Sequence, residues 1–225
     1  YYSEDAVLTS GQAVAFISGS KEYGVIIAPK HLAFNDTEIN RTGVSVFMTE
    51  QQARENELRG TQAAIEDAGA LGVMTAFNRV GITAANAHTG LLKNILRGEW
   101  GFKGLESQDF IMNPNYAVLK EYALNGGTMT TFTGENTMAA VSEKFAYWTT
   151  ENVVQDTELM SAIKQAMTWQ AYALANSNAL DGMASSTRLV SVRTWYDNAL
   201  VAVQVVFAVL TVLAAAMYVL NDRKS

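Results

Sequence analysis

The sequence has 225 residues, of which 49% are hydrophobic, no cysteine, and a formal net charge of −6. The length and composition predict one globular domain with a substantial core, and the interspersed, net negative charge argues against a nucleic-acid partner. The absence of cysteine excludes disulfides and thiolate metal sites, and His31 and His88 are the only histidines, so we expect neither a metal nor a cofactor.

The chain begins at Tyr1 and has the character of domain interior from its first residues. Neither a charged start nor an apolar signal segment follows Tyr1. We therefore expect the chain to be a fragment of a longer protein.

Four apolar runs that end in polar residues predict strands, at residues 24–28, 71–76, 103–107 and 128–132. Helical patterns separate these strands, at residues 50–68, 91–98 and 116–124. Thr49 is a suitable N-cap for the first of these helices, and Gly98 would close the second. Strands that alternate with helices indicate parallel βαβ units.

A closed (β/α)8 barrel needs eight such units, and this chain offers four. We therefore predict an α/β fold in which residues 1–175 form the C-terminal half of a TIM-type barrel. The last helix of this part covers residues 156–175, with Asp156 as its N-cap. Helical spacing predicts that its apolar face consists of Leu159, Ile163, Met167, Ala171 and Leu174.

Polar or aromatic residues follow each predicted strand. In chain order these residues are Lys30 and His31, then Phe77 and Asn78, then Asp109, then Thr133 and Glu135. The carboxyl ends of parallel barrel strands meet at one rim, where barrel enzymes keep their reactive groups. The pattern therefore predicts a site for a polar ligand, with Asp109 as the candidate reactive carboxylate.

The segment 199–220 contains no charged residue, and as a helix it would just cross a hydrocarbon core of about 30 Å. A buried core helix is the alternative, but such helices seldom run uncharged for so long. We predict a single transmembrane helix at 195–221 that contacts the lipid bilayer through residues 199–220. A stalk at 176–194 precedes it and a short tail at 222–225 follows it. Basic residues flank both ends, so charge alone does not set the orientation.

The sequence has no GxGxxG, P-loop, HExxH or GxSxG motif. Instead, several segments occur in a fixed order, namely YYSEDAVLTSG, PKHLAFNDTEINR, MTEQQARENELR, VMTAFNRVG and LLKNILRGEWGFKG, followed by Asp109. Together they resemble glycoside hydrolase family 3, of the β-glucosidase type, over roughly residues 1 to 180. The family branch that removes N-acetylglucosamine has a different motif after its Lys-His pair, which residues 35–38 do not match.

The resemblance implies roles for particular residues. Asp109 matches the catalytic nucleophile, and Lys30 and His31 match a pair that holds sugar hydroxyls. Phe77 stands where the family often has Tyr, so we expect altered activity or specificity. The flank of Asp109 also departs from the family, which more often has Ser-Asp or Thr-Asp. The resemblance further implies that the sugar-binding Asp and Arg lie upstream of Tyr1, and that the acid/base Glu belongs to a second domain outside this chain.

We therefore expect a membrane-anchored retaining exo-β-glycosidase that hydrolyses terminal β-linked sugars of saccharides or glycosides, with Asp109 attacking the anomeric carbon. The fragment alone should be inactive, because the upstream half of the barrel and the second domain are missing. We expect a single-pass protein of the cell membrane whose catalytic part is extracytoplasmic. Two alternatives stay open. One is a catalytically degenerate, membrane-tethered carbohydrate-binding or scaffold module, and the other is an unrelated barrel enzyme that uses Asp109 as a general base.

Overall fold

The structure is a computed structural model of the chain. It describes residues 2–41, 44–110, 118–131, 148–183, 187–188 and 190–222. The chain divides into two compact units, Tyr1–Asp181 and Gly182–Ser225.

The first unit contains a parallel sheet of three strands in the order β1-β3-β6. The strands are β1 (Lys30–Leu32), β3 (Gly72–Thr75) and β6 (Leu105–Gln108). A parallel bridge from Ser107 to Met129 continues the sheet beyond β6. The predicted parallel arrangement and the α/β class are therefore confirmed. A second, small sheet has the order β2-β4-β5, with β2 (Ser45–Val46), β4 (Arg79–Val80) and β5 (Thr83–Ala84).

The first strand lies later than predicted. Residues 24–28 form no strand, although the carbonyls of Ile27 and Pro29 accept hydrogen bonds from Gly72 N at 3.2 Å and Met74 N at 3.1 Å. Proline has no N–H to donate, and the regular strand begins immediately after it. Lys30 and His31 therefore lie within β1 and do not follow the first strand as predicted. The strand predicted at 71–76 contains β3, and the one predicted at 103–107 overlaps β6. Of the strand predicted at 128–132, residue 132 lies outside the described ranges.

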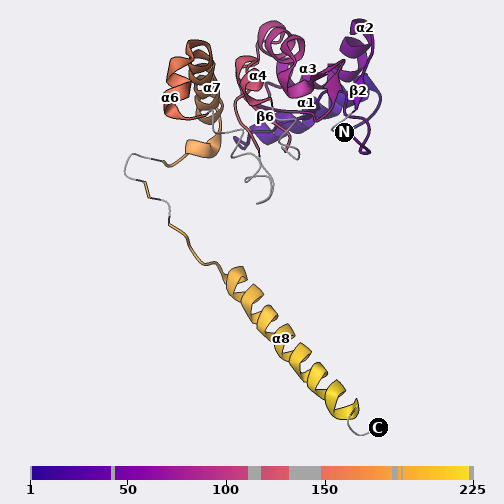
Figure 1. The fold of residues 1–225 in the computed structure, drawn as a ribbon, viewed down its shortest axis with the longest axis vertical. Helices are drawn as coiled ribbons and strands as arrows, with labels where there is room; N and C mark the ends of the chain where they lie inside the picture. Colours follow the sequence, from indigo (N-terminus) through magenta and orange to yellow (C-terminus); the bar gives the residue numbers. More distant parts are fainter. Residues whose placement is uncertain are drawn as a thin grey trace. The chain divides into compact units, whose positions relative to one another are not determined.

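An N-terminal helix, α1 (Ala6–Lys21), was not predicted from the sequence. Asp5 caps it, because its Oδ1 accepts a hydrogen bond from Leu8 N at 2.7 Å. Ala13 and Ile17 of α1 are buried, and the helix packs against α3 (Arg59–Glu66). Figure 1 shows α1, α3 and α4 beside the strands.

The helical run predicted at 50–68 is present in three pieces. They are α2 (Glu50–Gln52), the π-helical segment η1 (Ala53–Glu57) and α3 (Arg59–Glu66). Thr49 is confirmed as the N-cap, since its Oγ1 accepts a hydrogen bond from Gln52 N at 3.2 Å. The π-type bond from Leu58 N to Ala53 O, at 2.9 Å, adds a residue to this turn.

The helix predicted at 91–98 is the π-helical segment η3 (Gly90–Glu99), and it continues through Gly98. The prediction that Gly98 closes it is wrong. Gly101 has a φ of 59°, and Phe102 N donates to Leu96 O at 3.1 Å. This is the left-handed helix end that glycine favours, so Gly101 ends the helix. A 3-10 turn, η2 (Ala85–Ala87), precedes η3.

The remaining helices of this unit are α4 (Leu119–Leu124), α6 (Thr150–Gln155), α7 (Thr157–Ala175) and the 3-10 turn η5 (Asn178–Leu180). Of the helix predicted at 116–124, residues 119–124 form α4, residue 118 is not helical, and residues 116–117 lie outside the described ranges. Asp156 is confirmed as the N-cap of α7, because Leu159 N donates to its Oδ1 at 3.0 Å. Asn178 N donates to Gly24 O at 2.8 Å, so the compact unit continues beyond residue 175.

The predicted apolar face of α7 is partly wrong. Leu159 is buried as expected, but Met167 and Leu174 are 64% and 39% exposed. The other buried positions are Ala166 and Ala173. Because these buried residues are seven apart, α7 presents a narrow seam to its neighbours, and two small alanines face inward where larger side chains were expected.

Arg97 of η3 donates hydrogen bonds to backbone carbonyls that follow η3 and α4 in the chain. Its Nη1 donates to the carbonyls of Phe102 and Gly104, both at 2.9 Å, and its Nη2 donates to Gly126 O at 2.7 Å. The guanidinium also lies over the ring of Trp169, with Cζ 3.8 Å from the ring centroid. Burial lowers the pKa of Arg97 to about 10, so the group is still charged at neutral pH. It holds the turn that leads into β6.

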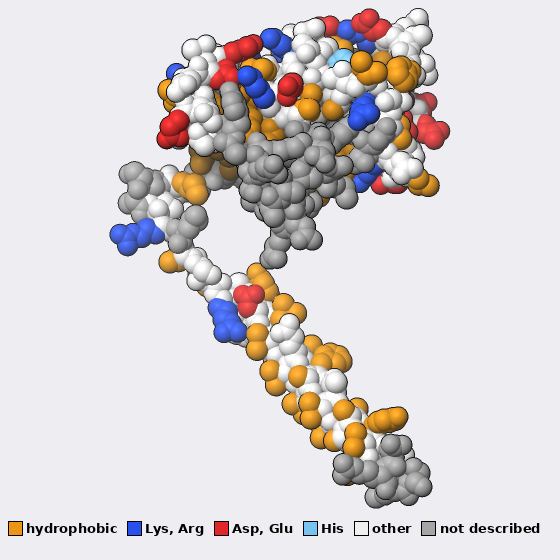
Figure 2. Space-filling view, in the orientation of Figure 1, with side chains coloured by type: hydrophobic (Ala, Val, Ile, Leu, Met, Phe, Trp, Pro, Cys, Tyr) orange, Lys and Arg blue, Asp and Glu red, His pale blue; other side chains and the backbone are white. Residues whose placement is uncertain are grey.

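The second unit contains α8 (Trp195–Asp222). Thr194 N donates to Asp197 Oδ2 at 2.7 Å at the start of this helix. Figure 2 shows hydrophobic side chains along the visible face of α8. Within the part of the chain that the structure describes, α8 is the one helix that is long and apolar enough to cross a membrane, by length and composition.

Candidate active site

Two of the predicted site residues meet across the parallel sheet. His31 belongs to β1 and Asp109 follows β6 directly, with β3 between them. His31 Nε2 lies 2.8 Å from Asp109 Oδ2, and the two side chains are 6% and 7% exposed. The fold therefore holds an imidazole against a carboxylate in a place where little water reaches either.

Asp109 is fixed by the backbone on both sides of it. Its N–H donates to Thr75 O at 3.1 Å, which continues the ladder between β3 and β6. Its Oδ1 accepts a hydrogen bond from Phe110 N at 2.8 Å. Because side chains alternate along a strand, Glu106 and Asp109 point to opposite faces. Asp109 is thus the one acid of this strand that faces His31.

The imidazole of His31 has a second polar neighbour in the same segment. Its Nδ1 lies 3.3 Å from the side-chain amide nitrogen of Asn35, which is 4% exposed. Burial lowers the pKa of His31, against the raising effect of Asp109, and the charges of Lys30 and Arg41 lower it further. His31 is therefore neutral at pH 7.

The other two predicted site residues, Lys30 and Phe77, differ in their exposure to solvent. Lys30 is exposed. Phe77 is 8% exposed, and Arg41 Cζ lies 4.6 Å from the centroid of its ring. The guanidinium of Arg41 also contacts Glu38, at 3.2 Å. Arg41 thus covers the ring of Phe77 and adds positive charge near His31.

Asn35 and Arg41 were not singled out by the sequence analysis, although both lie in the segment PKHLAFNDTEINR. Asn78, which was noted there, has a structural contact, since its Nδ2 donates to Ala33 O at 3.0 Å. Thr133 and Glu135 lie outside the described residues.

Glu106 is a second, unexpected acid of β6 and is completely buried. Neither of its carboxylate oxygens has a hydrogen-bond partner within the described part of the chain. Burial raises the pKa of Glu106 to about 7, with the opposing effects of Tyr122 and Arg97 too small to cancel it. Next to it, Gln108 is tied to Asn86, whose Nδ2 donates to Gln108 Oε1 at 2.6 Å.

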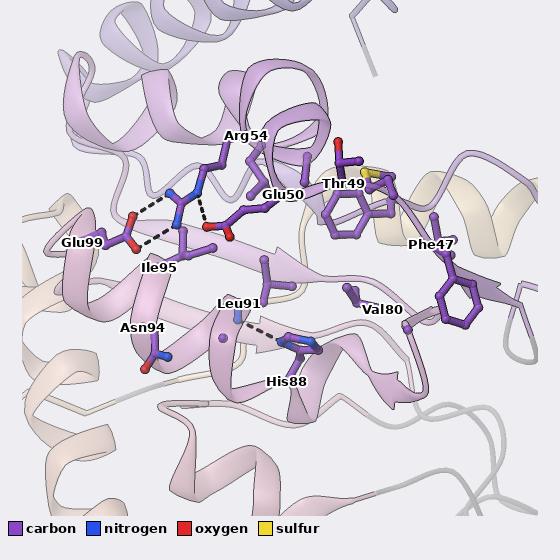
Figure 3. A pocket seen from close by; sticks show the side chains of 17 residues that line it. Phe47, Thr49, Glu50, Arg54, Val80, His88, Leu91, Asn94, Ile95 and Glu99 are labelled. Carbon is purple, nitrogen blue, oxygen red and sulfur yellow. Dashed lines mark hydrogen bonds and ion pairs between the residues drawn. The ribbon is translucent and has the colours of Figure 1, made fainter.

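A separate cavity of about 470 Å³ lies between η1, η3 and β2. At one end Arg54 pairs with Glu99 at 2.7 Å and with Glu50 at 2.9 Å (Figure 3). Elsewhere in the lining, His88 Nδ1 accepts a hydrogen bond from Leu91 N at 3.1 Å (Figure 3). The lining is mainly apolar, and it includes none of the predicted site residues, Lys30, His31, Phe77 and Asp109.

The chemistry available at the site is that of a carboxylate in contact with a neutral imidazole. A carboxylate in this setting can attack an electrophilic carbon or accept a proton. The amide of Asn35 and the guanidinium of Arg41 add polar groups of the kind that bind hydroxyls. Among the described residues, no cluster of three or more His, Asp or Glu side chains could hold a metal ion.

Comparison with known proteins gives a consistent result. The profile of the glycosyl hydrolase family 3 N terminal domain matches residues 1–168. Beta-glucosidase B of Emericella nidulans is 40% identical over 109 residues, which are 48% of this chain and 13% of that protein. The beta-glucosidase of Rhizobium radiobacter is 38% identical over 109 residues, with the same coverage. The chain thus spans 13% of the length of these curated relatives.

Solved structures agree. Beta-glucosidase 3B from Thermotoga neapolitana, in complex with alpha-D-glucose, matches with a TM-score of 0.67 and 26% identity, over 80% of this chain and 25% of that one. A beta-glucosidase from Paenibacillus barengoltzii matches with a TM-score of 0.69 and 26% identity, over 80% of this chain and 20% of that one.

Proposed function

The chain belongs to glycosyl hydrolase family 3, and from that premise we propose that it supplies the nucleophile-bearing part of a retaining exo-β-glycosidase. Terminal β-linked sugars are the substrate class, with β-glucosides first because the relatives and similar structures are β-glucosidases. Strands β1, β3 and β6 would belong to the C-terminal half of a (β/α)8 barrel. The other strands and a second domain would come from sequence outside this chain.

The observation that supports this proposal is the contact between His31 and Asp109. In the proposed reaction, Asp109 attacks the anomeric carbon, and the bond from that carbon to the leaving oxygen breaks. A general acid protonates the leaving oxygen. Water, deprotonated by the same residue, then attacks the anomeric carbon and frees Asp109. The sugar retains its configuration after two inversions.

We place the general acid outside the described residues. In a retaining enzyme the two carboxyl groups lie about 5 to 5.5 Å apart. Glu106 points to the opposite face of β6 from Asp109. Glu38 is exposed and pairs with Arg41 at 3.2 Å. Neither is placed as a partner for Asp109, which agrees with an acid contributed by another domain.

We also propose that α8 anchors the protein in a membrane as a single span. Its uncharged stretch has the length of a bilayer core, and Trp195, Tyr196 and Tyr218 stand where aromatic residues favour the two interfaces. The catalytic part would lie on the outer side of the cell membrane, where a glycosidase meets external saccharides.

A graft into a similar enzyme tests the catalytic proposal. Residues 1–168 would replace the matching segment of Thermotoga neapolitana beta-glucosidase 3B, which supplies the rest of the site. We expect the folded chimaera to release β-glucose first from an aryl β-glucoside, and an activated 2-deoxy-2-fluoroglucoside to label Asp109. Asp109→Asn should abolish both results, whereas the matched control Glu66→Gln, at an exposed position, should preserve them.

A catalytically degenerate sugar-binding module is the second candidate. Two observations favour it, namely the buried Phe77 ring beneath Arg41 and the buried acid Glu106 in the strand that carries Asp109. A chimaera that unfolds cooperatively and binds glucose, but shows neither turnover nor label on Asp109, would establish this candidate in place of the enzyme.

A further inference from the structure

We propose that Asn35 is a positioning residue that, together with Asp109, fixes the tautomer of His31. In this arrangement the amide of Asn35 donates a hydrogen bond to His31 Nδ1, and His31 Nε2–H donates to Asp109. The inference rests on the proposed function, because that function makes Asp109 the nucleophile. It adds a residue that acts on the nucleophile through His31 and need not touch the substrate.

The three side chains lie close to one another in the order Asn35, His31, Asp109. Asn35 Nδ2 lies 3.3 Å from His31 Nδ1, and His31 Nε2 lies 2.8 Å from Asp109 Oδ2. All three side chains are largely buried, so little water reaches these groups. Between His31 and Asn35 the chain turns at Phe34, whose φ is 67°, in the left-handed region that few residues with a side chain adopt. That turn brings Asn35 back beside the imidazole.

Hydrogen-bond chemistry sets the direction of each bond. An ionised carboxylate can only accept, so the ring nitrogen that faces Asp109 must carry a hydrogen. A neutral imidazole has one N–H, which leaves a lone pair on Nδ1. That lone pair needs a donor, and the amide NH2 of Asn35 is one. The reverse orientation, with the amide oxygen toward Nδ1, would require an imidazolium or place two lone pairs against each other.

The surrounding charges decide between the neutral ring and the imidazolium. Asp109 and Glu38 favour the charged ring, whereas Lys30 and Arg41 oppose it, and burial opposes it most, so the pKa of His31 is lowered. The ring is therefore neutral, and the choice that remains is between its two tautomers. Asp109 requires the proton on Nε2, and Asn35 supports this tautomer by donating a hydrogen bond to Nδ1.

The consequence concerns the nucleophile. With its proton on Nε2, His31 donates a hydrogen bond to Asp109 and holds that carboxylate in one orientation. The other tautomer would turn a lone pair toward the carboxylate and repel it. Asn35 would thereby keep Asp109 correctly aimed in the free protein and in the substrate complex.

The chain suits an NMR test, because it has two histidines. Its full length, labelled with 15N in the imidazole rings and kept in non-ionic detergent micelles, gives four ring-nitrogen signals. His88 is an internal reference, since its Nδ1 accepts from the backbone N–H of Leu91 at 3.1 Å and is independent of Asn35. We expect both wild-type histidines to show the neutral pattern with the proton on Nε2.

Two variants then separate the proposal from a purely structural role. Asn35→Asp presents an acceptor to Nδ1, so the protonation constant of His31 should rise at least about tenfold. Asn35→Ala removes the donor to Nδ1, so the Nδ1–H tautomer of His31 should become detectable beside the Nε2–H tautomer that Asp109 still favours. In both variants His88 should keep its wild-type signals, which reports that the fold survives.

Several outcomes would overturn the proposal. In the wild type, these outcomes are a mixture of His31 tautomers, a His31 imidazolium at pH 7, or a neutral His31 with its proton on Nδ1. In the variants, the outcome is a His31 signal pattern that stays as in the wild type while His88 is also unchanged. This readout needs no turnover. A chimaera that unfolds cooperatively and binds glucose but shows neither turnover nor label on Asp109 therefore refutes the glycosidase proposal and leaves the Asn35 result as a separate measurement.

Discussion

Replacing Glu106 by Gln should stabilise the protein at alkaline pH. Glu106 is completely buried in β6, and no described cation lies within ion-pair distance of its carboxylate. Arg97, the charge nearest in effect, donates its hydrogen bonds to backbone carbonyls. Burial raises the pKa of Glu106 to about 7, so ionising it works against folding.

The size of the effect follows from linkage. The pKa of Glu106 rises from 4.5 in the unfolded chain to about 7 in the folded protein. At about 1.4 kcal/mol per pH unit, this difference costs on the order of 3 kcal/mol of folding free energy above pH 7 and nothing below pH 4.5. The amide of Gln does not ionise in this pH range. The stability difference between Glu106→Gln and wild type should therefore grow by about 2 to 3 kcal/mol from pH 5 to pH 8.

Urea unfolding of the full chain in non-ionic detergent measures this difference, with tryptophan fluorescence, to which the buried Trp100 contributes, as the signal. Burying the amide that Glu106→Gln introduces, without hydrogen-bond partners, also costs folding free energy. That cost does not depend on pH, so it cancels when the stability differences at pH 5 and pH 8 are compared. Glu66→Gln is the matched control, because Glu66 is exposed. A stability difference that is the same at pH 5 and pH 8 would refute the reasoning.

Four further predictions concern the site and the membrane. The 225-residue chain alone should not turn over aryl β-glucosides, and activity that Asp109→Asn removes would contradict this. In the chimaera, Asp109→Gly should lose hydrolysis but form a glycosyl azide of inverted configuration with azide, whereas near-normal hydrolysis would end the nucleophile assignment. Lys30→Ala should lower kcat/KM by about 10- to 100-fold through lost hydroxyl contacts while Asp109 can still be labelled. Protease added to intact cells should remove residues 1–190, and protection until the membrane is permeabilised would reverse the orientation.

Local rules predicted much of the fold. Thr49 and Asp156 cap the helices expected of them, because a cap depends on residues three positions apart. The alternation of strands and helices likewise gave the parallel sheet. The first strand was misplaced because its apolar run precedes Pro29, where pairing is incomplete. The helix end at Gly101 was missed because the sequence offers two glycines within four residues and only backbone conformation distinguishes them.

The sequence analysis named Asp109 and His31, which lie in contact, but not Asn35 or Arg41 beside them. Asp109 ends a strand, and that position is visible in the sequence. Asn35 matters only because the turn at Phe34 returns it to His31, and no periodicity signals that turn. The burial of Glu106 was equally hidden. A parallel strand is covered on both faces, so its polar residues are buried together with its apolar ones.

Strand β6 and the residue after it therefore carry two acids, Glu106 and Asp109, for which ionisation has opposite consequences. Asp109 is useful when ionised, whereas ionised Glu106 destabilises the strand that positions it. Acidification protonates Glu106 and relieves this cost, but it also charges the unfolded forms of His31 and His88, whose pKa values are lowered in the folded protein. The histidines thus contribute stability above about pH 6.5 that is lost as the pH falls. Because Glu106 offsets part of that loss in the wild type, Glu106→Gln should lose stability more steeply between pH 7 and pH 5, by up to about 1.4 kcal/mol per pH unit. Equal slopes in the two proteins would show that Glu106 is already ionised, or already solvated, in the folded state.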